Sequence, residues 1–233
     1  MVIWKFYYDR LASALILSNS VLIFSASAWS FATSCSLSSV LNCDAILLTH
    51  GHFDHTADVV AIAKRLKCPV FCAFEIAEWL SQQGVEGAVG MNLGGTINVP
   101  GGAAKMEMAH HSSSLPDGTY AGSAASWLLE VGGKRIFLAG DTCLFSDMER
   151  IGRVDSQGNR LDVAVLPIGD TFTMGPDDSL EAIRLLKPHS VVPCHYGTWP
   201  PIEQDVEKWA ARVREEGIAS PHVMAPGESV TLQ

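Results

Sequence analysis

The sequence predicts a mixed α/β protein in which helices are layered against sheet. Two observations indicate this class. Short apolar runs typical of buried strands alternate along the chain with segments whose apolar residues recur at helical spacing. Hydrophobic residues also make up 48% and charged residues 18% of the 233 residues, which is enough for a sizeable core and excludes global disorder.

The expected elements follow in order after Asn42. Apolar runs bounded by Gly or polar residues predict strands, and the segments between them have helical periodicity. Seven glycines from Gly84 to Gly102 predict loops and a hairpin in that stretch. Gly132-Gly133 joins two further strands as a hairpin. The full expectation is strands at 45–48, 69–73, 105–109, 126–131, 135–139, 162–167 and 190–193, and helices over 57–66, 75–83, 178–186 and 203–216.

The amino-terminal segment has a different composition. Residues 11–43 carry no charged side chain, and a basic start and an apolar run precede the small residues 26–28. This order is typical of a secretory signal, whereas the stretches 14–17 and 21–24 also fit a pair of buried strands in the main sheet. Both interpretations stay open. Polar residues at 18–20 interrupt the apolar run, so no stable membrane span is expected.

Composition argues against several classes of function. The chain has 25 Asp and Glu against 16 Lys and Arg, which gives a formal net charge of −9. We therefore do not expect it to bind nucleic acid non-specifically through phosphate contacts. Six cysteines in 233 residues are too dilute for a small disulfide-scaffolded protein. The chain has no Gly-x-Ser-x-Gly sequence, so serine hydrolase chemistry has no support. The eight histidines are more informative because they cluster.

The most specific pattern is Thr49-His50-Gly51-His52-Phe53-Asp54-His55, directly after the first expected strand. His50 and His52 are two residues apart, so they cannot share a helix face and need a turn or an extended loop. Gly51 permits the unusual backbone angles that such a turn requires. Neutral imidazole and carboxylate groups are the ligands that zinc and similar ions prefer. The pattern therefore predicts metal binding, and a solvated loop that happens to contain histidines is the alternative.

Three more side chains of ligand type follow expected strands. His110-His111 comes after the strand at 105–109, Asp141 after the strand at 135–139, and His195 after the run 190–194. Alone, Asp141 would be interpreted as a turn or helix-cap residue and His195 as a half-buried histidine. Sites in layered α/β proteins gather where strand ends and their loops converge, so we expect one shared centre.

Six motifs occur in a fixed order: Leu48-Thr49-His50-Gly51-His52-Phe53-Asp54-His55, His111-Ser112-Ser113-Ser114, Ala139-Gly140-Asp141-Thr142, Pro167-Ile168-Gly169, Phe172-Thr173-Met174-Gly175-Pro176 and His195-Tyr196-Gly197-Thr198. With them, the chain from about Asp44 onward resembles the metallo-β-lactamase-fold superfamily. The likeness is to its small bacterial metal-dependent hydrolases near the ascorbate-6-phosphate lactonases. It implies a four-layer αββα sandwich with two metal ions between the sheets. The family's Gly-His-Ser strand and Ile-Asp-Pro turn are missing before Asp44. We therefore predict an atypical segment over 1–43 and a metallo-hydrolase domain, packed as a single domain, over 44–233.

The resemblance also implies the metal ligands. His111 is preferred to His110 because the family's ligand directly precedes the serines. An all-imidazole set around the first ion favours zinc, with manganese, iron or nickel as alternatives. The implied ligands are His50, His52 and His111 for the first ion, Asp54, His55 and His195 for the second, and Asp141 as a bridge between both.

The activity implied by the resemblance is metal-dependent hydrolysis by a hydroxide that bridges the two ions. Asp54 would also orient that hydroxide or pass a proton to the leaving group, and Phe172, Thr173 and Tyr196 are candidates for substrate contacts. Carboxylic esters or lactones are the favoured substrates, as for a carboxylesterase or lactonase. A phosphodiester or a phosphorylated lactone is the alternative, and a weak β-lactamase side activity stays open. A non-catalytic metal-binding protein is the alternative from another class.

The expected partner is a small-molecule substrate, without nucleic acid, and a homo-oligomer is compatible with the sequence. Cytoplasm is the family's usual location. Export is the alternative if residues 1–28 act as a signal.

Overall fold

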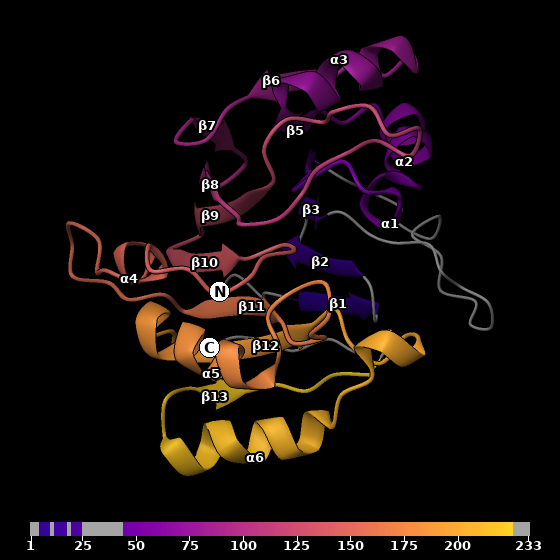
Figure 1. Cartoon of the computed structure of the whole chain (residues 1–233). Coiled ribbons are helices and arrows are strands. Elements are labelled where there is room, and N and C mark those ends of the chain that lie inside the picture. Colours follow the sequence, from indigo (N-terminus) through magenta and orange to yellow (C-terminus); the bar gives the residue numbers. More distant parts are fainter. Residues whose placement is uncertain (1–4, 10–11, 18–19, 25–43, 226–233) are drawn as a thin grey trace. The chain divides into compact units, whose positions relative to one another are not determined.

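The computed structural model describes residues 5–9, 12–17, 20–24 and 44–225 of the chain (Figure 1). Its contacts divide the chain into two compact units. The first unit contains Met1–Gly95, Ser112–Ala125 and Met224–Gln233, and the second contains Thr96–His111 and Ser126–Val223. Each unit carries one sheet, so each is described by itself.

The sheet of the first unit has six strands in chain order. The first three pair antiparallel and the remaining pairs are parallel. Strands β4 and β5 are almost entirely apolar because a parallel strand is covered on both faces. The strands are β1 (Lys5–Asp9), β2 (Ala12–Leu17), β3 (Ser20–Phe24), β4 (Ala45–Leu47), β5 (Val70–Ala73) and β6 (Ala88–Met91).

Three helices belong to this unit: α1 (Phe53–Thr56), α2 (Val59–Leu66) and α3 (Phe74–Gln82). In α2, Val59, Ile62 and Ala63 are buried on one face, which is the spacing expected of an amphipathic helix. They pack with Ile46 of β4 and Val70 of β5 into a single hydrophobic core. This core fixes the carboxyl end of β4, where the histidine-rich motif begins.

The sheet of the second unit has seven strands, ordered β13-β12-β11-β10-β9-β8-β7. The hairpins β7–β8 and β9–β10 are antiparallel, and the pairs from β10 to β13 are parallel. The strands are β7 (Thr96–Val99), β8 (Gly102–Met108), β9 (Ala125–Val131), β10 (Lys134–Leu138), β11 (Val163–Pro167), β12 (Ser190–Cys194) and β13 (Ser220–Pro221).

The helices of the second unit are α4 (Met148–Ile151), α5 (Pro176–Leu186) and α6 (Val206–Glu216), with a 3₁₀ turn at Pro200–Ile202. Helix α5 packs against β11 and α4, and α6 lies beside β13 (Figure 1). The buried Trp209 of α6 donates its indole N–H to Ser179 Oγ of α5 over 2.8 Å. This hydrogen bond satisfies the polar end of a large, fully buried side chain.

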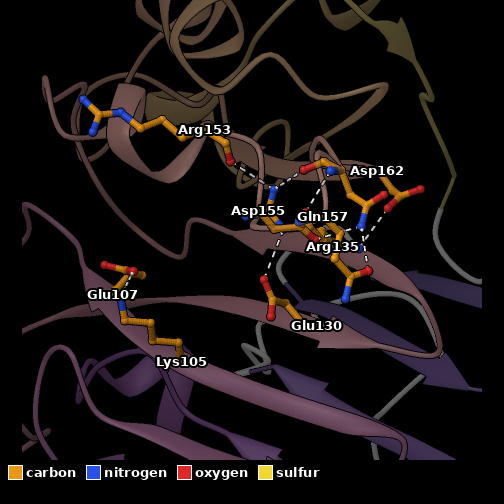
Figure 2. Close-up of polar contacts among 9 residues, drawn as sticks. Lys105, Glu107, Glu130, Arg135, Arg153, Asp155, Gln157 and Asp162 are labelled. Atoms are coloured by element: carbon orange, nitrogen blue, oxygen red, sulfur yellow. Dashed lines mark hydrogen bonds and ion pairs between the residues drawn. The ribbon is translucent and has the colours of Figure 1, made fainter.

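Figure 2 shows how polar contacts anchor the loop that precedes β11. The buried guanidinium of Arg135 in β10 donates to the carbonyl oxygens of Arg153 and Asn159 and forms an ion pair with Glu130. Asp162 accepts the Arg135 backbone N–H over 2.8 Å. These bonds set the start of β11 against β10, since every donor on the buried guanidinium needs a partner.

A second polar cluster lies on β8, where Glu107 is buried. Its carboxylate is 2.8 Å from Lys105 Nζ and 2.5 Å from Arg150 Nη2 of α4. Burial alone would raise the pKa of Glu107, but hydrogen bonds and positive charge from Arg150 and Lys105 outweigh it and hold the pKa below its usual value. The ion pairs therefore fasten α4 to the sheet.

Most expected elements are present with boundaries shifted by a few residues. Helix α2 begins at Val59 instead of residue 57, and α6 begins at Val206 instead of residue 203, because the 3₁₀ turn and the cap residue Asp205 precede it. The glycine-rich stretch contains β6 and β7, and β7 forms the expected hairpin with β8. The two-residue strand β13 was not expected from the sequence.

In the amino-terminal segment, the two stretches considered as strands coincide with the greater part of β2 and β3, and β1 is an additional strand. Residues 25–43, with the small residues of the signal-like pattern, lie outside the described residues. The packing of 44–233 as a single domain stays a prediction. Within the described residues, no helix combines the length and the apolar character needed to cross a membrane.

Candidate metal centre

The first ligand set consists of His50, His52, Asp54 and His55, all in the first unit. It begins three residues after the end of the buried strand β4, and His50 is fully buried. The chain then turns at His52 into α1, and the His52 carbonyl oxygen accepts the backbone N–H groups of His55 and Thr56. Asp54 and His55 thus lie on the short helix, while the other two ligand candidates lie in the preceding loop.

The four side chains of this set are close together. His50 Nε2 lies 2.9 Å from His52 Nδ1. The rings of His50 and His55 have centroids 4.1 Å apart, and His55 Nε2 lies 3.4 Å from Asp54 Oδ2. The structure thus brings these four predicted side chains together within the first unit.

Two hydroxyl groups orient the imidazoles of the loop. Thr49 Oγ1 is 3.1 Å from His50 Nδ1, and Ser112 Oγ is 3.3 Å from His52 Nε2. When each hydroxyl oxygen accepts an N–H from its ring, the lone pairs remain on His50 Nε2 and His52 Nδ1, the two nitrogens that face one another. Two facing lone pairs repel unless they share a cation. The donor set therefore fits a metal ion.

Gly51 has a different role from the one predicted. Its φ is not in the left-handed region, so the loop does not need glycine for its backbone angles. The reason is space: a Cβ at Gly51 would lie 2.4 Å from the Cβ of Ala121. The Gly51 N–H also donates to Ser113 Oγ. Residues 112–125 therefore pack directly against the histidine loop, which a single sequence pattern does not reveal.

The second ligand set consists of His111, Asp141 and His195, all in the second unit. Each follows a strand, namely β8, β10 and β12. Asp141 Oδ2 lies 3.2 Å from His195 Nε2 and 3.7 Å from His111 Nε2. One carboxylate oxygen thus faces two imidazoles, the arrangement expected of a carboxylate that serves a metal site. The structure brings these three predicted residues together within their unit.

Backbone and hydroxyl contacts hold the loops of the second set in place. Thr142 Oγ1 accepts the His110 backbone N–H over 3.0 Å, and the Thr142 carbonyl accepts the Met174 N–H over 2.9 Å. Ser126 Oγ lies within hydrogen-bond distance of the carbonyl oxygens of Met108 and Ala139, at the ends of β8 and β10. Thr142 and Ser126 are positioning residues that sequence reasoning did not identify, although Thr142 directly follows Asp141 in a recognised motif.

His195 has a positive φ of 53°, which is uncommon for a residue other than glycine. The neighbouring Gly169 approaches it so closely that a Cβ would lie 2.1 Å from the His195 carbonyl oxygen. Burial, with a smaller contribution from the negative charge of Asp141, raises the pKa of the adjacent Cys194 thiol. That thiol therefore stays protonated at neutral pH, so it does not offer a thiolate beside the imidazoles.

The three predicted substrate contacts differ in their exposure. Phe172 is 48% exposed, whereas Tyr196 is buried and the Thr173 hydroxyl donates to the Met174 carbonyl oxygen. Sequence reasoning missed Trp199, whose ring stacks on that of Phe172. Nothing in the spacing of the two residues indicates this contact, since they belong to different loops.

Comparison with known proteins agrees with this description. The sequence profile of the family described as "Beta-lactamase superfamily domain" matches residues 19–196, so the match begins further toward the amino terminus than residue 44. A UPF0173 metal-dependent hydrolase of Thermus thermophilus is 51% identical over 189 residues, which cover 81% of each chain. One from Enterococcus faecalis is 44% identical over 195 residues, covering 82% of this chain and 83% of the relative.

Among solved structures, the chain is similar to Igni18, a metallo hydrolase from the archaeon Ignicoccus hospitalis. The TM-score is 0.87 at 31% identity, with 100% of this chain and 99% of the other covered. The metallo-β-lactamase fold predicted from the sequence is thereby confirmed. The chain therefore belongs to the beta-lactamase superfamily, and it is a metal-dependent hydrolase with the metallo-β-lactamase fold.

Proposed function

We propose that the two ligand sets together form a centre for two divalent ions. In each unit every donor lies within 3.7 Å of another donor or in ring contact with one. All seven are side chains that could hold a metal ion. The assignment suggested by the sequence motifs is His50, His52 and His111 for one ion, Asp54, His55 and His195 for the other, and Asp141 for both.

The donor chemistry supports zinc as the resident ion. The set contains imidazole nitrogens and carboxylate oxygens, which suit zinc well, and manganese, iron and nickel are the alternatives. The ions, when bound, would supply an acidified water and a positive charge that polarises the bond to be hydrolysed. The protein's own contribution is to hold the ligand side chains in place and to transfer protons during the reaction.

Asp54 is the residue that we assign to proton transfer. Its side chain is 19% exposed, whereas that of Asp141 is 6% exposed. The Asp54 carboxylate therefore has contact with solvent, while Oδ2 lies 3.4 Å from His55 Nε2. A carboxylate that lies beside an imidazole and has contact with solvent can orient a water and carry a proton to a leaving oxygen.

Carboxylic esters and lactones are the substrate class that we favour. The loops beside Asp141 and His195 contain Phe172 and Trp199, and neither 169–175 nor 195–201 contains a Lys or Arg. A phosphate ester would be expected to meet a positive side chain, so this composition favours an uncharged substrate. A phosphodiester or phosphorylated lactone is the second candidate, because two-metal sites also suit that chemistry.

We place the reaction in the cytoplasm, on a small molecule.

The test combines metal analysis with a substrate panel of phenyl acetate, γ-butyrolactone and bis-p-nitrophenyl phosphate. We expect two ions per chain and ester or lactone hydrolysis that a chelator removes and added zinc restores. Asp54→Asn should retain metal yet lose about 100-fold or more in kcat. The exposed carboxylate Asp147, at the start of α4, provides the control Asp147→Asn, which should behave as the wild type.

Three outcomes would contradict the proposal. One ion per chain would contradict the two-ion centre, and near-normal turnover by metal-loaded Asp54→Asn would contradict the role of Asp54. Metal binding without turnover of any substrate in the panel would favour the non-catalytic alternative. Turnover of the phosphodiester alone would select the second candidate instead.

A further inference from the structure

Phe172 and Trp199 form an exposed aromatic pair in the second unit, which we call the aromatic platform. Their rings are stacked with centroids 5.6 Å apart and an interplanar angle of 11°. Phe172 is 48% and Trp199 is 43% exposed, so much of both rings faces water. Large aromatic side chains contribute most to stability when they are buried, and a stacked exposed pair is a surface suited to another flat apolar group.

The backbone under the platform is held in an uncommon conformation. Asp170 and Thr171 have φ of 61° and 55°, and the β-branched Thr171 is a marked outlier in this region. The Phe172 N–H donates to the Asp170 carbonyl over 2.5 Å, which closes a turn of γ type at Thr171. Conformations of this kind persist only where surrounding contacts impose them, and they cluster at functional sites.

The two loops of the platform are joined to each other and to the second ligand set. Thr171 Oγ1 donates to the Pro201 carbonyl over 2.9 Å, which links the loop of Phe172 to that of Trp199. Trp199 follows His195 by four residues on the same loop. On the other side, the Met174 N–H donates to the carbonyl of Thr142, the residue after Asp141. The segments that carry two metal-ligand candidates therefore also carry the platform.

We propose that the aromatic platform is a substrate subsite that binds the planar apolar part of an ester or lactone by stacking. This inference rests on the proposed function and adds the shape of the substrate to it. The occupant carries no negative charge, because neither loop offers a Lys or Arg to an anionic group. The two rings already stack on each other without a ligand, so little side-chain entropy is lost on binding.

Two lactones that differ by a fused ring test the subsite. Dihydrocoumarin is δ-valerolactone with a fused benzene ring. The hydrolysis of both lactones is measured by the protons that it releases. In Trp199→Leu and Phe172→Leu we expect the ratio of kcat/KM for dihydrocoumarin to that for δ-valerolactone to fall about tenfold, mainly through KM. Trp199→Phe should keep most of the ratio. Phe74→Leu, at an exposed aromatic residue of α3 in the first unit, should leave it unchanged.

A binding measurement separates failure of the subsite from failure of the proposed function. The unreactive alcohol 2-naphthylmethanol is titrated into the full chain and observed by ligand NMR. Weakening of about tenfold in Trp199→Leu, but not in Phe74→Leu, supports the platform even if neither lactone is hydrolysed. A kcat/KM ratio within twofold of the wild type, or naphthylmethanol binding that is absent or insensitive to Trp199→Leu, overturns the proposal.

Discussion

Thr49→Val should weaken metal binding while leaving the shape of the chain intact. Valine has the volume and branching of threonine, so the substitution removes little more than the hydroxyl that lies 3.1 Å from His50 Nδ1. Both residues are buried, so water does not readily replace that hydroxyl. The imidazole then loses the contact that fixes which of its nitrogens faces His52.

The magnitude follows from the cost of a lost hydrogen bond in a buried place, about 1–3 kcal/mol. This range corresponds to a loss of about 5- to 150-fold in metal affinity. Removing the hydrogen-bond partner of a metal-ligating histidine typically lowers metal affinity by about 10- to 100-fold. We therefore expect the zinc Kd to rise by about 10- to 100-fold.

Competition with a chromophoric chelator measures this Kd directly and does not depend on the identity of the substrate. Thr49→Ser keeps a hydroxyl in place and should remain within about threefold of the wild type. The reasoning is refuted if Thr49→Val binds zinc as tightly as the wild type, or if Thr49→Ser is weakened as strongly as Thr49→Val.

Three further predictions concern packing and charge. Gly51→Ala should destabilise the chain by about 1–3 kcal/mol, because the new Cβ would lie 2.4 Å from that of Ala121. Adding Ala121→Gly should restore much of the lost stability in denaturant unfolding. If the two substitutions instead have additive effects on the free energy of unfolding, the contact is contradicted. Ser126→Ala should cost about 1–2 kcal/mol, because a buried carbonyl at the end of β8 or β10 loses its donor, and an unfolding midpoint equal to that of the wild type would exclude this role. The folded-state pKa of Glu107 is lowered, so its stabilising contribution is present above the unfolded value near 4.5 and is lost as pH falls through the folded pKa. The free energy of unfolding of the metal-free wild type should therefore exceed that of Glu107→Gln by about 1 kcal/mol at pH 7, and this difference should vanish below pH 4.5. A difference that does not change with pH would disprove the charge effect.

Local pattern was sufficient for features that depend on neighbouring residues. Strand β4 is apolar throughout and ends three residues before His50, so both the strand and the position of the first ligand set follow from the sequence. The same holds for Asp141 after β10 and His195 after β12. In each case the signal is a buried strand followed within three residues by a ligand-type side chain.

Features that depend on contacts between distant segments could not be predicted. Gly51 is required by the approach of Ala121, and the exposed stack joins Phe172 to Trp199. The two-residue strand β13 exists only because β12 offers it a partner. Spacing within one segment contains no information on such contacts, whereas the resemblance to a family supplied the order of the ligands.

The left-handed backbone at His195 has an evolutionary consequence. A histidine held in this conformation has a conformational cost that glycine or asparagine would avoid. The proposed metal-binding role of His195 gives selection a reason to keep the imidazole despite that cost, whereas a relative without a metal ion would be expected to tolerate glycine there.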